Sequence, residues 1–440
     1  MGIITTFNKD NYQEALMAGE CEPYGVYSPF INIDLIKYNN LRSNTSPPDL
    51  CPIQRRLSVD HFSNIRGCIG LTLRYARTFF PAYEFFVNEF INDEWISSVD
   101  WHKKFHRDHI IHQPMSVYVG LSLLRGFKFQ KNPIFFNEKV LSLCLNALRQ
   151  SDYIREYFED MKISPMARLE LETLFIDTFF LATLFHDIGY PWQFVNAICK
   201  KLGNHVSDIP LNQSTEQILN RYSKRLLFYP FNGYKKPDLT EPSYWQKSMY
   251  SFISDGMHKT HGMPGAISFL YLNDILRQYP ENDSPPLRRF CLEWAAMAIL
   301  MHDMADFYAE VDENSRLQIK KPQLRLSIEK DPLSFMLTLT DQIQDFNRPD
   351  ATFSEHRTPI STDINIRYSY RCDKVELHWE DSSRVLTIKY FYNNPRDYLE
   401  NRNEFLPKRQ LQYFDPYRGY LDYSGLGISE IKLEAKLVRP

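Results

Sequence analysis

Apolar residues recur every three to four positions through much of the first 350 residues, a period typical of helices. This period predicts helices at 61–95, 108–126, 136–158, 169–185, 264–279, 286–307 and 332–346. Gly189 and Pro191 should end the helix at 169–185, because both residue types stop helices. Pro332 should open the last one, since proline is tolerated in a first turn.

Two stretches lack a clear period. Residues 1–60 read as irregular, with a loop or extended segment around Pro47 and Pro48. Residues 203–260 are rich in Tyr, Pro and Ser, and we expect an insertion with short helices that drapes over the helical core.

After about residue 355 the apolar period falls to two, which indicates strands. Strands are expected at 364–370, 374–380, 384–392 and 430–438, with a hairpin turn at 380–383 and a helix at 396–411. The fold class is therefore a mainly α-helical core followed by a small C-terminal α+β module. We divide the chain into an irregular or helical extension (1–100), a helical domain (101–350) and the module (351–440).

Composition narrows the class of protein. The 440 residues are typical of two or three domains, and a hydrophobic content of 43% is ordinary for a folded soluble chain. A net charge of −3 disfavours a general nucleic-acid-binding protein, which usually carries a basic excess, but leaves room for a basic pocket that binds a small phosphate ester.

The seven cysteines include no CxxC pair and are odd in number, which fits buried reduced thiols in a cytoplasmic protein. The N-terminal residues lack a signal-peptide pattern. No run of 18 uncharged apolar residues occurs, so we expect no membrane span and a cytoplasmic location.

Six side chains that can bind metal lie in or beside the apolar helical segments. They are His112, the pair His186-Asp187, His261, His302 and Asp341. Taken singly, each of them apart from the His186-Asp187 pair is more often a satisfied polar residue than a ligand. Burying so many without partners would cost several kcal/mol each, which a metal would offset. A metal-bound water is a strong nucleophile near neutral pH, so the set indicates hydrolysis.

The neighbouring residues support a role in metal binding more strongly for some of these six side chains than for others. Pro114 is awkward inside a helix, so that helix is expected to start near Gln113, with His112 close to its N-cap. His186-Asp187 directly follows a long apolar run and is the most specific pair. Gly262 and Pro264 indicate a helix start just after His261, while His258 upstream is a spare ligand or substrate contact.

In this order and these contexts the chain resembles the HD-domain metal-dependent phosphohydrolases. The resemblance covers roughly 100–350 and rests on RDHIIH with a glycine eight residues after His112, on LFHDIG, on THGMPGA and on LTLTDQIQDF. It implies an HD-type helical fold. It also implies that His112, His186, Asp187 and Asp341 hold one ion, and that Asp187 bridges to a second ion held by His261 and His302.

The resemblance further implies hydrolysis of a nucleotide-like phosphate ester with Mn, Fe, Mg, Zn or Ni/Co ions, two in number. Lys259 and Arg107 are candidate phosphate contacts beside predicted ligands, with a solvated surface charge as the alternative. Tyr190 stands where many two-metal members carry Lys, and it becomes a candidate substrate contact.

Two other functions stay open. A non-catalytic HD-type sensor or interaction protein would account for Tyr190 and for the unassigned module. A mononuclear nucleoside-triphosphate hydrolase would use His112, His186, Asp187 and Asp341 alone. The module itself fits a regulatory ligand-binding domain, a surface for homo-oligomers or a lid.

Overall fold

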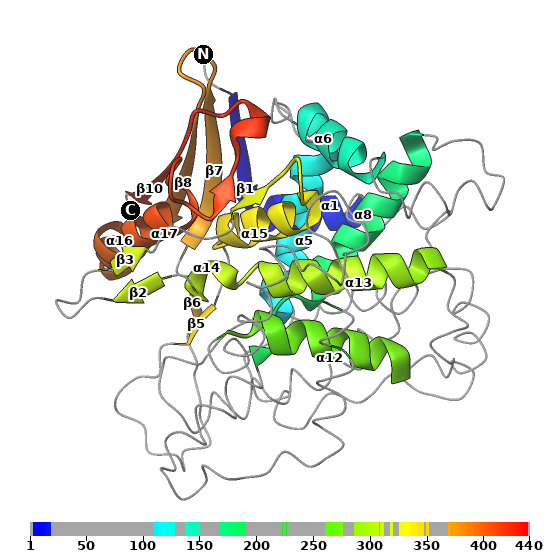
Figure 1. Ribbon diagram of the computed structural model, residues 1–440. Helices are drawn as coiled ribbons and strands as arrows, with labels where there is room; N and C mark the ends of the chain where they lie inside the picture. Colours follow the sequence, from blue (N-terminus) through cyan, green and yellow to red (C-terminus); the bar gives the residue numbers. More distant parts are fainter. Residues whose placement is uncertain are drawn as a thin grey trace, which may run out of the picture.

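The computed structural model places a group of helices beside a small β-sheet (Figure 1). It describes residues 3–18, 109–127, 137–149, 168–190, 222, 226, 260–275, 286–307, 309–311, 317–319, 325–346, 349–351, 368–370 and 372–438. The helix expected at 61–95 and nearly all of the insertion expected at 203–260 lie outside these residues. None of the described helices is long and apolar enough to cross a membrane.

The helical core is built from helices close to those that the apolar period predicts. They are α5 (His109–Arg125), α6 (Asn137–Arg149), α8 (Arg168–Phe185), α12 (Gly262–Ile275), α13 (Pro286–Met301), the short α14 (Met304–Phe307) and α15 (Pro332–Ile343). Helix α8 packs against α5 and α13, and α13 also packs against α12 and α15. From Leu171 in α8 and from Phe290 in α13, nearly every side chain is buried, so these helices lie inside the core rather than on its surface.

Close approach of α5 and α8 depends on Gly120. A Cβ at this position would lie 2.1 Å from Cζ of Phe179, a buried residue of α8. Only glycine leaves room for the ring at this distance.

Two helix boundaries differ from the prediction. The start near Gln113 is wrong, because α5 begins at His109 and carries Pro114 in its second turn. The single helix expected at 286–307 is also wrong, since it is broken by a turn at His302 and Asp303. Burial of the apolar flanks on both sides outweighs the hydrogen bond that Pro114 cannot donate.

The sheet has the strand order β1-β7-β8-β10. Its strands are β1 (Ile3–Asn8), β7 (Cys372–Glu380), β8 (Val385–Tyr392) and β10 (Glu430–Leu437). The pairs β1–β7 and β7–β8 are antiparallel, whereas β8–β10 is parallel. Burial alternates along β7 and β8, so one face of the sheet packs on the core and the other faces solvent.

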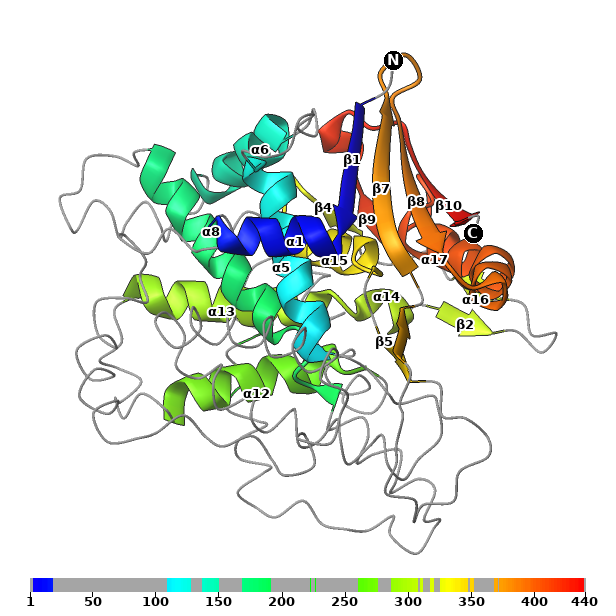
Figure 2. The same cartoon turned by 180° about the vertical axis from the view of Figure 1, so that it is seen from behind.

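The irregular N-terminus that we expected is wrong for residues 3–17. They form the edge strand β1 and the helix α1 (Lys9–Met17), seen beside the sheet in Figure 2. Phe7 faces the core, where its ring meets Tyr118 of α5 edge-on at 5.7 Å. The sheet is therefore not built from C-terminal residues alone.

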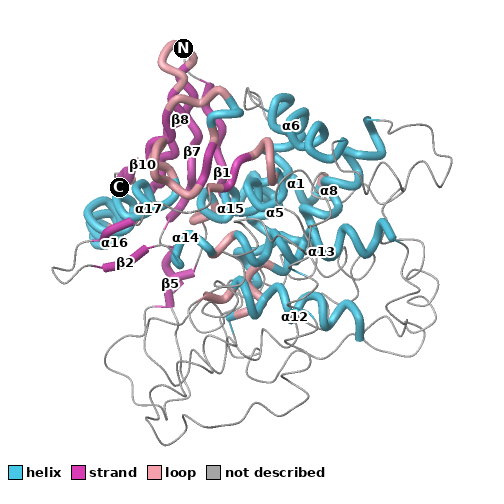
Figure 3. The backbone as a smooth tube through the Cα atoms, viewed as in Figure 1, coloured by secondary structure: helices cyan, strands magenta, loops and turns pink. Residues whose placement is uncertain are grey.

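The C-terminal helices cover the sheet beside β10 and β8. They are α16 (Pro395–Glu400), a π-helical turn η3 (Asn401–Phe405) and α17 (Leu406–Tyr413). The three follow one another without a break, so the helix predicted at 396–411 is present, with a π-helical turn inside it. Figure 3 shows these helices at the side of the strands.

Short strands complete the described structure. β2 (Ala309–Val311) pairs with β3 (Leu317–Ile319), β4 (Leu326–Ser327) with β9 (Leu421–Asp422), and β5 (Pro349–Ala351) with β6 (Tyr368–Tyr370). Of the predicted strand at 364–370, only β6 is described, and it pairs with β5 rather than with the sheet. The three described cysteines, Cys144, Cys291 and Cys372, are buried free thiols, as expected.

Candidate metal centre

The fold brings all six predicted ligands together from five helices. His112 comes from α5 and Asp341 from α15, while His261 directly precedes α12. The two His-Asp pairs occupy equivalent positions: His186-Asp187 follows the last residue of α8, and His302-Asp303 follows the last residue of α13. In both cases a buried apolar helix delivers a histidine and an aspartate to its C-terminal end.

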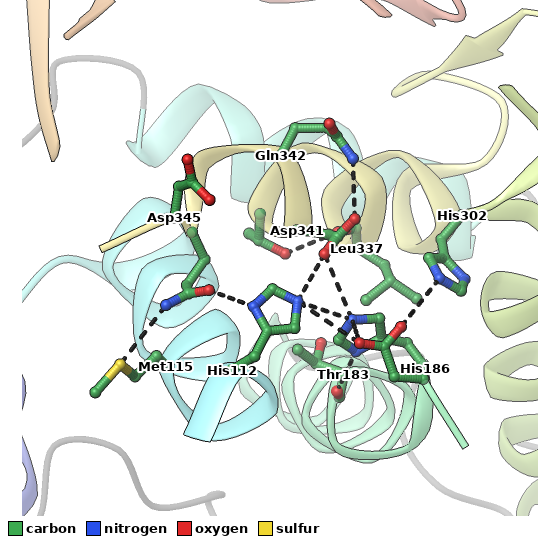
Figure 4. A network of polar contacts seen from close by, with 12 residues as sticks. His112, Met115, Thr183, His186, His302, Leu337, Asp341, Gln342 and Asp345 are labelled. Atoms are coloured by element: carbon green, nitrogen blue, oxygen red, sulfur yellow. Dashed lines mark hydrogen bonds and ion pairs between the residues drawn. The ribbon is translucent and has the colours of Figure 1, made fainter. Parts of the chain in front are cut away.

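The first half of the centre lies between α5, α8 and α15. His112 Nε2 lies 2.8 Å from Asp341 Oδ1 and 3.3 Å from His186 Nε2. His186 Nε2 in turn lies 3.5 Å from Asp341 Oδ1. Figure 4 shows the two imidazoles facing one another with the Asp341 carboxylate beside them.

The second half lies between α12 and α13. His261 Nε2 and His302 Nε2 are 3.0 Å apart. Both nitrogens face Asp187 Oδ1, at 3.1 Å from His261 and 3.7 Å from His302.

The Asp187 carboxylate lies between the two halves and divides its oxygens between them. Oδ2 faces the first half, 3.3 Å from His186 Nε2 and 3.8 Å from His112 Nε2, while Oδ1 faces the second. His112, His186 and Asp187 thus form one buried group that can hold a metal ion, and Asp187, His261 and His302 form another.

The Nδ1 atoms of all four histidines point away from the centre toward acceptors. His112 Nδ1 donates to the Gln344 side chain, and His186 and His302 donate to the backbone carbonyls of Thr183 and Ile299. His261 Nδ1 lies 2.9 Å from Asp303 Oδ2. Such partners fix the ring orientation and the tautomer of metal-binding histidines.

This pattern leaves the neutral imidazoles with Nε2 lone pairs aimed at one another and at carboxylate oxygens. Lone pairs at these distances repel unless a cation lies between them. An ion bonded to each donor at about 2.1 Å would hold neighbouring donors about 3.0–3.4 Å apart. Donor pairs in the two halves are separated by 2.8–3.8 Å and 3.0–3.7 Å, ranges that include the expected separation, so each half could hold a divalent ion.

Without an ion, protons must take the role of the cation. Burial lowers the pKa of His261, but Asp303 and Asp187 outweigh burial and raise this pKa to about 10. The pKa of His186 is also raised: burial opposes this, yet the charges of Asp187 and Asp341 prevail. Burial alone would raise the pKa of Asp341, but His112 and His186 hold it well below its usual range. The centre thus has a strong preference for positive charge.

Access differs among the ligands. Five of the six residues are at most 7% exposed, whereas the Asp341 side chain is 20% exposed. The Tyr190 ring, a predicted substrate contact, stacks on the His261 ring with centroids 3.8 Å apart. The other predicted contacts, Lys259, Arg107 and His258, lie outside the described residues.

Sequence reasoning gave no role to two residues that hold the ligands. Asp303 Oδ2 accepts hydrogen bonds from the backbone N–H groups of His261 and Gly262, so it both orients His261 and caps the first turn of α12. Its position beside His302 was the available signal. Gln344 offered none, because its contact with His112 spans 232 residues.

Gly189 sets the spacing between the two halves. A Cβ there would lie 1.8 Å from the carbonyl oxygen of His261 and 2.6 Å from the backbone nitrogen of Gly265. The backbone that follows Asp187 therefore touches the backbone that carries His261, and only glycine permits this contact.

Comparisons with protein families, with curated proteins and with solved structures found no match to this chain. The candidate centre therefore rests on the geometry of its own residues.

Proposed function

We propose that this chain is a divalent-metal-dependent phosphohydrolase or phosphodiesterase with an HD-type centre, acting on a nucleotide-like phosphate ester. The observation that carries the proposal is the Asp187 carboxylate, whose two oxygens face two separate sets of histidines. A carboxylate in this position supports two ions about 3.5–4 Å apart, the separation typical of two-metal phosphoryl chemistry.

Ions held there would lower the pKa of water and neutralise charge on the phosphoryl oxygens. The chain supplies the rest. His112, His186 and Asp341 are the further ligands of the first ion, and His261 and His302 those of the second. Gln344, Thr183, Ile299 and Asp303 keep the four Nδ1 protons away from the centre, so that each Nε2 remains free to bind.

The Asp341 side chain is the most exposed of the six ligands, so we expect an ester to approach the centre beside it. The exclusion of water by the buried ligands strengthens electrostatic interactions at the phosphorus. Substrate choice would then depend on groups outside the ligand set, among which Lys259, Arg107 and His258 remain candidates.

The test is hydrolysis of a generic phosphodiester and a nucleotide panel by the full chain loaded with Mn²⁺ or Fe²⁺. Asp187→Asn keeps the side-chain volume and removes the bridging charge. It should lower kcat by more than about 100-fold, since even residues that only orient ligands cost 10- to 100-fold. Asp373→Asn, on the exposed side of β7, is the matched control and should retain full activity. A metal-loaded protein with no activity on any panel member would refute the proposal.

A single-ion hydrolase is the main alternative. It is favoured by Asp303, which lies close enough to His261 to hold that imidazole as a cation instead of a ligand. His261→Ala and His302→Ala would then leave the metal content at one ion and preserve much of the activity. Two ions in the wild type and one in these variants would exclude it.

A non-catalytic metal-binding sensor is the second alternative. The Tyr190 ring covers one face of His261, so part of the second half is shielded from a substrate. Tyr190→Ala should leave a sensor inactive, whereas in an enzyme it should change KM or kcat on the active substrate.

A further inference from the structure

Three side chains of the C-terminal module end on backbone carbonyls of the helices that carry the metal ligands. The Tyr420 hydroxyl donates to the carbonyl oxygen of Met301 at 2.7 Å. The Tyr390 hydroxyl and Arg409 Nη1 donate to the carbonyl oxygen of Gln342, at 2.9 and 3.2 Å. The donors are 119, 48 and 67 residues away from their acceptors in sequence.

These carbonyls belong to the last turns of two helices. Met301 is the final residue of α13, and Gln342 is the penultimate residue of α15. Carbonyls in a last turn have no partner within the helix and depend on outside donors. A cation such as Arg409 is also favoured at a helix C-terminus, where the helix dipole is negative.

Each carbonyl belongs to the residue directly before or after a metal ligand in the sequence. The Met301 carbonyl belongs to the peptide bond that leads into His302. Gln342 follows Asp341 directly, and its side-chain nitrogen donates to Asp341 Oδ2 at 2.9 Å. Fixing these two peptide groups therefore fixes the backbone from which one ligand of each half projects.

The donors are themselves held in place. Tyr390 and Tyr420 are at most 1% exposed, and burial raises the pKa of Tyr390, so its hydroxyl keeps the proton that it donates. The Arg409 guanidinium lies over the Tyr390 ring at 5.6 Å and 3.9 Å from the Asp345 carboxylate. Arg325 donates to the carbonyls of Gly419 and Leu421, on either side of Tyr420.

We infer that the C-terminal module positions the metal centre through these contacts. Tyr420 sets the end of α13 and with it His302, in the second half. Tyr390 and Arg409 set the end of α15 and with it Asp341, in the first half. This inference rests on metal binding at the centre, which the proposed function also assumes, but not on hydrolysis.

Replacing one tyrosine by phenylalanine removes the donor and keeps the ring. We expect Tyr420→Phe to weaken binding of the ion in the second half by about twofold to tenfold, the factor that one hydrogen bond supports. Tyr390→Phe should do the same to the ion in the first half. Tyr423→Phe is the matched control, since that buried hydroxyl donates to Phe414 within the module.

The probe is Co²⁺ titrated into the full-length, metal-stripped chain. Calorimetry measures each binding step, and visible absorption reports the ligand geometry of each ion. A merely structural role would lower Tm in all three variants alike and leave both affinities and both spectra unchanged. That result, with Co²⁺ still bound, would overturn the inference and leave the proposed function standing.

Two other results distinguish this inference from the proposed hydrolase function. Selective weakening of one ion per variant would support the inference even if the chain hydrolyses no ester. A wild-type chain that binds no Co²⁺ would overturn both.

Discussion

Replacing Gly189 by alanine offers a sharp test of how the centre is assembled. The added Cβ would start 1.8 Å from the His261 carbonyl oxygen, and real Cβ atoms essentially never come within 3.0 Å of such an atom. The backbones at Gly189 and His261 must therefore separate by about 1.2 Å, from 1.8 to 3.0 Å. The obstacle is backbone rather than a flexible side chain, so it cannot rotate away.

A movement of this size is large for a metal ligand. Metal–ligand distances are held to within about 0.2 Å, so His261 would leave the coordination sphere of the ion that it shares with Asp187. The first half has no atom in this contact and should keep its ion. Overpacking of a buried contact also costs about 1–3 kcal/mol of unfolding free energy.

The assay is metal content per chain together with thermal unfolding. Gly189→Ala should bind one ion in place of two and unfold at a lower temperature. Gly425→Ala is the control, because the three atoms nearest to its Cβ would all belong to the side chain of Glu329, which is exposed and free to shift. A Gly189→Ala protein with two ions and an unchanged Tm would refute the argument from close contact.

Three further predictions concern metal and pH. When a chelator keeps the chain free of metal, the pKa of His261 is about 10, above its ordinary value of 6.5. Protonation of His261 then adds to the unfolding free energy below pH 6.5, and this contribution is lost as the pH rises toward 10. Denaturant unfolding at a series of pH values measures the loss. Saturating Mn²⁺ should abolish that loss, because the ion replaces the proton. Mn²⁺ at one hundred times its Kd should add about 2.7 kcal/mol to the unfolding free energy, so a Tm insensitive to chelator would contradict metal binding. Gln344→Leu removes the acceptor of His112 Nδ1 and should weaken the ion in the first half by about 10- to 100-fold in calorimetry; equal affinity would show that His112 needs no such partner.

Much of the fold follows from local periodicity. The apolar period places α8 and α15 to within one to three residues at each end, and the alternation along β7 and β8 gives the hairpin. These elements are predictable because the spacing of apolar residues along a short stretch of sequence shows which faces of the helix or strand are buried.

Elements that depend on distant partners escaped prediction. β1 is an edge strand whose partner, β7, lies some 370 residues later, so no local pattern reveals the pairing. The break after α13 places His302 and Asp303 in a turn, although buried apolar residues stand on both sides of it.

In the candidate metal centre, too, some residues could be predicted from the sequence and others could not. The six ligand candidates could be chosen from residue type and apolar context, and the structure brings all six together. The side chains that orient them, such as Gln344 and Asp303, have no sequence signature of their own. Their roles arise from contacts that only the packed helices create.

Elemental analysis of the purified full-length chain tests the central claim most directly. Asp187 bridging two sets of ligands predicts two divalent ions per chain, and fewer than two in Asp187→Asn with the fold retained. A wild-type chain that carries no transition metal after exposure to Mn²⁺, Fe²⁺ or Zn²⁺, or an Asp187→Asn chain that still carries two ions, would contradict it.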